Sequence, residues 1–160
     1  MFREIRRFKQ ALTKEECIKV LTEEKRGILS VLGDDDYPYG MPINHWYNPE
    51  DGKIYFHSGP GGHKLESIAK HNKVSFCVYD KGYYDEGEIS WALNIKSIIV
   101  FGKMEIVEDK ELALHAVRQL SYKFTQDDAY IDDDIERNGK AVVMLALTPE
   151  HMTGKLVNES

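Results

Sequence analysis

Short runs of β-branched and aromatic residues recur along this sequence, and turns rather than helices separate most of them. The turn-prone stretch Asn48–Gly52 lies between two such runs, so residues 37–57 are predicted to form a hairpin. Parallel strands need long crossover connections, and this spacing therefore favours an antiparallel barrel with accessory helices over a doubly wound sheet. The runs that predict the six strands are 27–32, 37–47, 53–57, 74–79, 94–107 and 141–147.

Three segments with helical periodicity accompany the strands, over residues 13–25, 63–71 and 108–124. Thr13 and Glu16 fit a capping box at the start of the first. The acidic stretch 127–134 is expected to be a solvated loop or an exposed helical turn, and Pro149 to stop the last strand. Gly102 is expected to mark a bulge or bend, and residues 80–92 to form a long polar and aromatic excursion.

Length and charge bound the kind of protein. The chain has 160 residues, which suits a single domain over 1–160, and a net charge of -6 with a pI near 5.5. Such a balance argues against electrostatic binding to nucleic acid or to a membrane surface, and no run approaches the ~20 apolar residues of a membrane span. Two cysteines are too few for a disulfide framework, so a cytoplasmic protein is expected.

The segment from His57 to Lys64 carries the clearest candidate chemistry. A predicted strand ends in His57 and Ser58, a glycine-rich loop follows, and a helix begins with Lys64 in its first turn. Helix N-termini attract phosphate through unpaired N–H groups, and glycines allow close approach of the backbone. The spacing is neither a Walker loop nor a Rossmann fingerprint, so an ordinary turn with a surface lysine is an equal alternative.

A proline interrupts the predicted strand over 37–47. Pro42 cannot donate to a strand ladder, so this strand is expected to be an edge, bulged or open at that point. An open strand offers backbone groups to a planar heterocycle, although an edge strand merely protected by proline is the better interpretation of this segment taken alone. No histidine or cysteine spacing fits a zinc site.

Several short motifs, in order, resemble the flavin-binding split-barrel family, in its branch related to pyridoxamine-phosphate oxidase that contains the nitroimidazole-resistance (Nim-type) proteins. The resemblance covers the chain from about Arg3 to Lys155, and its specificity comes from the order and spacing of the motifs. They are Tyr37–Asn44, Ile54–Ser58, Gly62–Leu65, Val74–Phe76, Ser97–Gly102 and Met152–Lys155.

The resemblance implies a mainly β fold, a six-stranded antiparallel split β-barrel, that forms a homodimer and binds FMN at the subunit interface. It places the FMN phosphate at the end of the third strand and the start of the next helix, and the isoalloxazine edge along the proline-bearing strand. His57 matches a family histidine near the flavin and is the candidate catalytic residue. The residues that correspond to FMN contacts are Met41, Pro42, Ile43, Asn44, His57, Ser58, His63, Lys64 and Ser97.

The implied function is an FMN-dependent oxidoreductase, a reductase of small planar nitroaromatic or quinone-like acceptors that takes electrons from NAD(P)H or another reductant. His57 could donate a proton to the reduced substrate. The loop lacks the arginine-rich clamp of the oxidase branch, and no Trp and Arg pair occurs in residues 151–160, so a true pyridoxine-phosphate oxidase is not expected. The alternatives are a non-catalytic module that senses, carries or sequesters flavin, haem or deazaflavin, and a structural dimer with an empty pocket.

Overall fold

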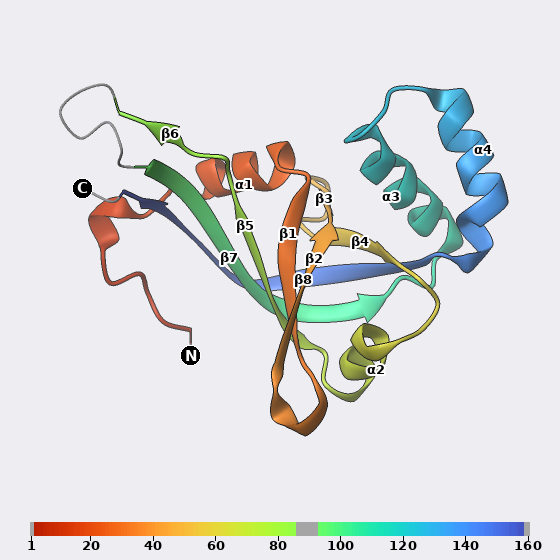
Figure 1. Ribbon diagram of the computed structural model, residues 1–160, viewed down its shortest axis with the longest axis horizontal. Coiled ribbons are helices and arrows are strands. Elements are labelled where there is room, and N and C mark those ends of the chain that lie inside the picture. The colour runs from red at the N-terminus through yellow and green to blue at the C-terminus, as the bar shows by residue number, and fades with distance from the viewer. Residues whose placement is uncertain (1, 86–92, 159–160) are drawn as a thin grey trace.

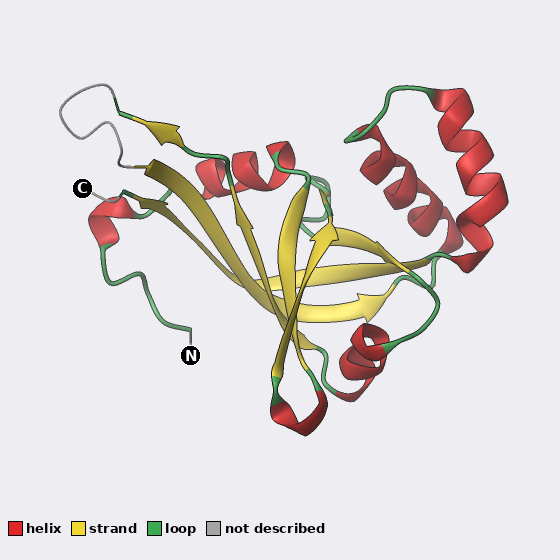
Figure 2. Ribbon diagram, in the orientation of Figure 1, coloured by secondary structure: helices red, strands yellow, loops and turns green. Residues whose placement is uncertain are grey.

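One curled antiparallel sheet dominates the computed structural model, with helices packed around it (Figures 1 and 2). The structure describes residues 2–85 and 93–158. The strands are β1 (Arg26–Leu32), β2 (Pro38–Asn44), β3 (Trp46–Tyr47), β4 (Ile54–Ser58), β5 (Lys73–Tyr79), β6 (Tyr83–Tyr84), β7 (Leu93–Ile106) and β8 (Val143–Val157). The helices are α1 (Lys14–Glu23), α2 (His63–Lys70), α3 (Lys110–Tyr122) and α4 (Asp128–Asn138), with short 3-10 turns at Phe8–Gln10, Asp34–Asp36 and Gly139–Ala141.

The strand order β2-β1-β5-β7-β8-β4-β3 wraps the sheet almost onto itself, while β6 pairs with β7 outside this path. The chain passes directly from β2, at one end of the path, to β3, at the other. This arrangement is the half-barrel of a split β-barrel, and the predicted fold class, mainly β with accessory helices, is confirmed. Within the described residues, no helix is long and apolar enough to cross a membrane.

Alternation along the strands builds the core. Every second residue of β1, β5 and the middle of β7 is buried, which is the period expected of strands with one face on a core. Helix α1 covers one opening of the half-barrel through Cys17, Val20 and Leu21. Its predicted capping box is present, because Thr13 Oγ1 accepts from the Glu16 N–H and Glu16 accepts from the Thr13 N–H. A second apolar cluster lies under α3 on the other face of β4 and β8.

The hairpin predicted over residues 37–57 is wrong for its longer half. Strand β2 pairs with β1, with Pro42 opposite Ile28, and only the two residues of β3 pair back onto β4. The cause is a buried residue, His45, which ends β2 and turns the chain across the half-barrel. The run over residues 37–47 therefore forms two strands, β2 and β3, which lie at opposite ends of the sheet path.

The expected end of the last strand also needs correction. Pro149 does not stop the last strand, because it lies opposite Gly102 at a bulge between Phe101 and Gly102, where a missing ladder donor is tolerated, and β8 continues to Val157. The bulge itself was expected at Gly102 and is confirmed.

The acidic stretch 127–134, expected to be a solvated loop or an exposed helical turn, forms the N-cap and the first seven residues of helix α4, which is longer than a single turn. Asp127 caps this helix by accepting from the Tyr130 N–H, and Ile131 anchors it. Within the predicted excursion over 80–92, Tyr83 and Tyr84 form β6 against β7, and residues 86–92 lie outside the described part of the chain.

His45 holds the corner between β2 and β3. Its ring is fully buried, packs edge-on against Phe76 at 5.0 Å, and donates from Nε2 to the Leu21 carbonyl of α1 at 2.8 Å. Because that carbonyl can only accept, the neutral Nε2–H tautomer is required. Burial, followed by the nearby Lys123 ammonium, lowers the pKa of His45 from 6.5 to about 3.

We expect this corner to make the fold acid-sensitive. Because the native state holds His45 neutral, the stability it provides is complete above pH 6.5 and is lost as the pH falls toward 3. Between pH 7 and pH 5 the wild type should lose roughly 2 kcal/mol of unfolding free energy from this one group. His45→Gln should be less stable at pH 7 by about 1–2 kcal/mol but should lack this acid-dependent loss.

Urea unfolding at pH 7 and pH 5 measures both effects. The exposed His71 offers a matched control, since His71→Gln should retain the acid dependence of the wild type. An equal loss of stability on acidification in His45→Gln and the wild type would contradict the assignment.

Candidate functional site

The split of the barrel leaves a hollow between β2 and β4. Its volume is ≈ 430 Å³, and it is lined by Arg26, Pro42, Ile43, Asn44 and His57. Three of these residues come from the end of β2, one from the start of β1 and one from β4. Two parts of the sequence that were predicted to contact one ligand, the proline-bearing strand and His57, therefore face the same space.

Strand β2 presents its edge to this hollow. It is the last strand of the sheet path at this side, so one of its edges is unpaired by the strands that the structure describes. Pro42 discourages a further strand from pairing there, which keeps the neighbouring backbone groups accessible. Arg26 donates from Nε to Asn44 Oδ1 at 2.7 Å, so the Asn44 side chain is oriented by the adjacent strand.

The loop between β4 and α2 has the features of an anion site. Gly62, the N-cap of α2, has a φ of 96°, a conformation that favours glycine, and no side chain within the described residues caps the helix. A Cβ added at Gly59 or Gly61 would meet open space, so the loop is not packed against protein. The first N–H groups of α2 therefore remain available to a negatively charged group.

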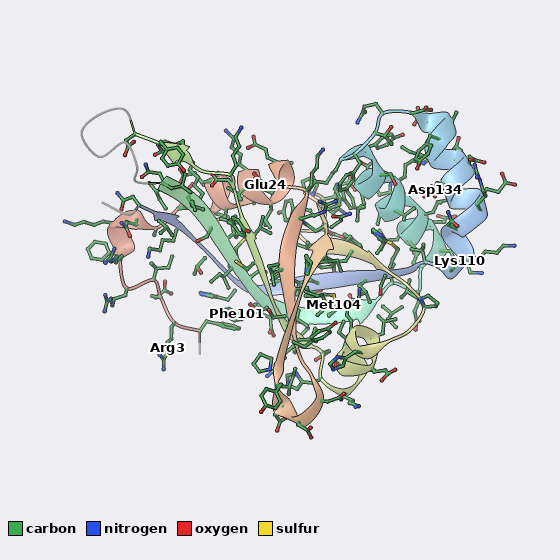
Figure 3. The ribbon with its side chains drawn as sticks, in the orientation of Figure 1. Arg3, Glu24, Phe101, Met104, Lys110 and Asp134 are labelled. Carbon is green, nitrogen blue, oxygen red and sulfur yellow. The ribbon has the colours of Figure 1, made fainter. Side chains whose placement is uncertain are left out.

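His57 and Lys64 lie on the two sides of this loop and interact electrostatically. Burial by surrounding atoms, followed by the Lys64 charge, lowers the pKa of His57, while Asp134 on α4 opposes the shift. Burial also lowers the pKa of Lys64. Asp134 lies on the helix at the edge of the molecule and is labelled in Figure 3. A cation with incomplete solvation beside an uncapped helix start is well suited to an anionic ligand.

Other predicted site residues are placed differently. His63 turns toward the β1–β2 connection, where its ring stacks on Tyr39 at 4.3 Å and its Nε2 lies 3.6 Å from Asp34 Oδ2. Ser58 is buried at the end of β4, opposite Val143. The side chain of Met41 packs against the core, so only its backbone belongs to the exposed edge of β2.

Ser97 is not brought to the hollow within one chain. It lies on β7, opposite Tyr79 of β5 and Lys155 of β8. Strands β1 and β5 separate β7 from β2, which places Ser97 on the order of 14 Å from β2 along the sheet at roughly 4.8 Å per strand. The nine predicted residues thus divide into five at the hollow and its adjoining loop, three with inward-facing or diverted side chains, and one distant serine.

Arg26 is a residue of the hollow that the sequence did not single out. It lies three residues after the end of α1 and begins β1, in a stretch where a basic residue carries no distinctive pattern. Its position beside Asn44 depends on the pairing of β1 with β2, which hydrophobic periodicity does not reveal. The nearest feature in the sequence is the next residue, Gly27. A side chain at Gly27 would clash with Phe76 and with the backbone of Cys77.

The comparisons with known proteins agree with this architecture. The sequence model of the family described as pyridoxamine 5'-phosphate oxidase matches residues 13–156. The chain therefore belongs to the pyridoxamine 5'-phosphate oxidase family of FMN-binding split barrels. No protein of curated function matches the sequence.

Solved structures share the fold at low identity. One is a protein of Bacteroides thetaiotaomicron assigned to 5-nitroimidazole antibiotic resistance, with 23% identity, a TM-score of 0.77, and 92% of this chain and 87% of that chain covered. Another is an FAD-binding protein of Mesorhizobium loti, with 26% identity, a TM-score of 0.68, and 92% and 97% covered. A third is an FAD- and haem-binding protein of Mycobacterium smegmatis, with 17% identity, a TM-score of 0.68, and 95% and 74% covered.

Proposed function

We propose that this protein is an FMN-dependent reductase of small planar acceptors, with nitroaromatic and quinone-like compounds as the substrate class. The observation that carries the proposal is the hollow between β2 and β4, which has an open strand edge on one side and His57 on the other, beside the uncapped start of α2. Family membership supports flavin as the ligand. The resistance protein of B. thetaiotaomicron among the structural neighbours supports the nitroaromatic class.

The residues present fit a flavin mononucleotide. Lys64 supplies a positive charge, and the first N–H groups of α2 supply donors, so the two would hold the phosphate. The unpaired edge of β2 around Pro42 and Asn44 would hold the polar edge of the ring system through backbone groups. FMN ends at its phosphate, which Lys64 and the first N–H groups of α2 would bind. FAD would need additional contacts for its adenosine half.

The flavin, when bound, supplies the electron transfer. The chain supplies orientation, charge and a proton. Arg26 places a permanent cation at the hollow, where negative charge on a reduced ring would be stabilised in partly desolvated surroundings. His57 lies at the same hollow and is the group that could deliver a proton to a reduced acceptor. Because its pKa is lowered, His57 acts as an acid only on the acidic side of neutrality.

Purified protein should be yellow, and Lys64→Ala should weaken FMN binding by about tenfold or more, since a charge-assisted contact to phosphate is lost. Quenching of FMN fluorescence measures the affinity. Lys70→Ala is the matched control, because Lys70 is an exposed lysine at the far end of the same helix. Wild-type protein that is colourless and fails to quench added FMN would refute the proposal.

Anaerobic reduction with NADH or NADPH, followed by a nitroimidazole or a quinone, tests turnover. We expect the rate of acceptor reduction to fall as the pH rises through a pKa below the usual histidine value of about 6.5. At saturating FMN, His57→Gln should remove this dependence and slow the reaction by about 10²-fold, within the range of general acid catalysis. Tight FMN binding without acceptor reduction would instead indicate a cofactor-binding module.

We further propose that the protein is a homodimer whose flavin sites draw on both chains. The outer face of the sheet carries an apolar row, Ile28, Cys77 and Ile99, on three adjacent strands, flanked by Tyr79 and Phe101. Ile99 is 39% exposed and Tyr79 57% exposed in one chain. A second copy on this face would cover these side chains and would bring its own Ser97 toward the hollow that Ser97 of the same chain does not reach.

Sedimentation equilibrium of FMN-loaded protein should give twice the chain mass of 18.4 kDa. Ile99→Glu should shift the mass to that of the monomer, because a charge cannot be buried unpaired at the centre of an isologous interface of roughly 800 Å² per partner. Tyr130→Glu, at an exposed aromatic residue of α4, should remain dimeric. A wild-type mass of 18.4 kDa with flavin bound would contradict the shared site.

A further inference from the structure

A large apolar cavity lies between helices α3 and α4 and the adjoining ends of β7 and β8. Its volume is ≈ 730 Å³, and nine of its fourteen lining residues are aliphatic or methionine. Val117 of α3, Ile135 of α4 and Met144 of β8 contribute to three of its walls. Figure 1 shows the two helices side by side at one end of the sheet.

The cavity exists because α4 is attached to α3 rather than to the sheet. Arg118 of α3 pairs with Asp132 and Asp128 of α4, and the Tyr122 hydroxyl donates to Asp128 Oδ1 at 2.6 Å. These contacts hold α4 away from β7 and β8, and they leave apolar side chains of the cavity in contact with water. Leu114 is 50% exposed and Ile106 is 55% exposed. Covering such surface is favourable because it removes apolar side chains from water.

The charges at the cavity balance. Glu108, Lys110, Glu136 and Lys140 line it, two of each sign, and Lys110 is labelled at the start of α3 in Figure 3. A ligand with a full charge would meet an opposite and a like charge in equal number, so this set offers no net attraction to either sign. An uncharged ligand avoids the cost of desolvating a charge against the apolar walls.

The size of the cavity favours a small molecule over a protein partner as its ligand. Ligand pockets commonly enclose about 300–1,000 Å³ and are lined mainly by apolar groups. A stable protein interface uses roughly 20–30 residues on each side, more than the fourteen found here. We propose that this cavity binds an uncharged, predominantly apolar small molecule.

The cavity adjoins the candidate flavin site without sharing its lining. Met144, which lines the cavity, is the strand partner of His57, and Val143 is the partner of Ser58. An occupant would therefore lie against β8, one strand away from the residue that faces the hollow between β2 and β4. The inference rests on the cavity itself and stands whether or not the chain binds flavin.

The test uses the full-length protein and two probes with related aromatic skeletons, uncharged N-phenyl-1-naphthylamine and anionic 1-anilinonaphthalene-8-sulfonate. Fluorescence titration should show saturable binding of the uncharged probe at one site per chain, about tenfold tighter than the anionic probe. Equal or tighter binding of the anionic probe would overturn the proposed ligand class, and absence of saturable binding would overturn the site.

Variants locate the probe. Ala113→Trp, which places an indole in the cavity, should weaken binding of the uncharged probe by about tenfold or more, whereas Ala129→Trp, at an exposed position of α4, should not. Leu114→Ser removes a half-exposed wall residue and should weaken binding about fivefold with little risk to folding, which circular dichroism checks. Unchanged affinity in both cavity variants would refute the location.

Two further readouts distinguish other occupants. FMN titration should give the same affinity with and without the probe, and Ala113→Trp should retain FMN binding; competition between FMN and the probe would place the probe in the flavin hollow and overturn the proposal. Sedimentation should give one mass for Ala113→Trp and Ala129→Trp. A dimer lost only in Ala113→Trp would assign the cavity to a contact between copies of the chain.

Discussion

The hydrogen bond from His45 to the Leu21 carbonyl fixes the corner on which the half-barrel depends. It lies where the chain leaves β2, at one end of the sheet path, and enters β3, at the other. Lys123, from the C-cap of α3, donates to the Leu21 and Glu24 carbonyls at the end of α1, so three elements meet at this point. Burial lowers the pKa of Lys123 to about 8, and the nearby ammonium in turn favours the neutral ring of His45.

The candidate site follows from the same corner. Because β2 turns away at His45 instead of pairing with β4, a gap remains between these strands, and Pro42 keeps the exposed edge of β2 from acquiring another strand. His57 faces this gap from β4, and the glycine loop that follows delivers Lys64 at the start of α2. The site is therefore a consequence of an incomplete barrel closure, with charge supplied by the segment that directly follows the closing strand.

Local patterns in the sequence were sufficient for the approximate positions of most strands, the capping box and the loop before α2, because each depends on residues close in sequence. Pairing across the sheet was not readable in the same way. A continuous run over 37–47 looks like one strand of a hairpin, and only the burial of His45 divides it between two ends of the sheet. Pro149 is tolerated within β8 because its missing donor falls at a bulge. The sequence does not mark Arg26, because its role depends on Asn44, eighteen residues away.

The acidic segment shows how the structure distributes charges that look uniform in sequence. Of the aspartates on α4, Asp128 and Asp132 pair with Arg118 of α3 and attach the two helices to each other. Asp133 pairs with Arg137 within α4 itself. Asp134 instead acts on His57, where it opposes the effects of burial and of Lys64. An anion bound at Lys64 would offset the charge that lowers the pKa of His57, while Asp134 would continue to raise it. A phosphate at Lys64 would therefore offset the smaller of the two effects that lower the pKa of His57, while the larger one, burial, would remain.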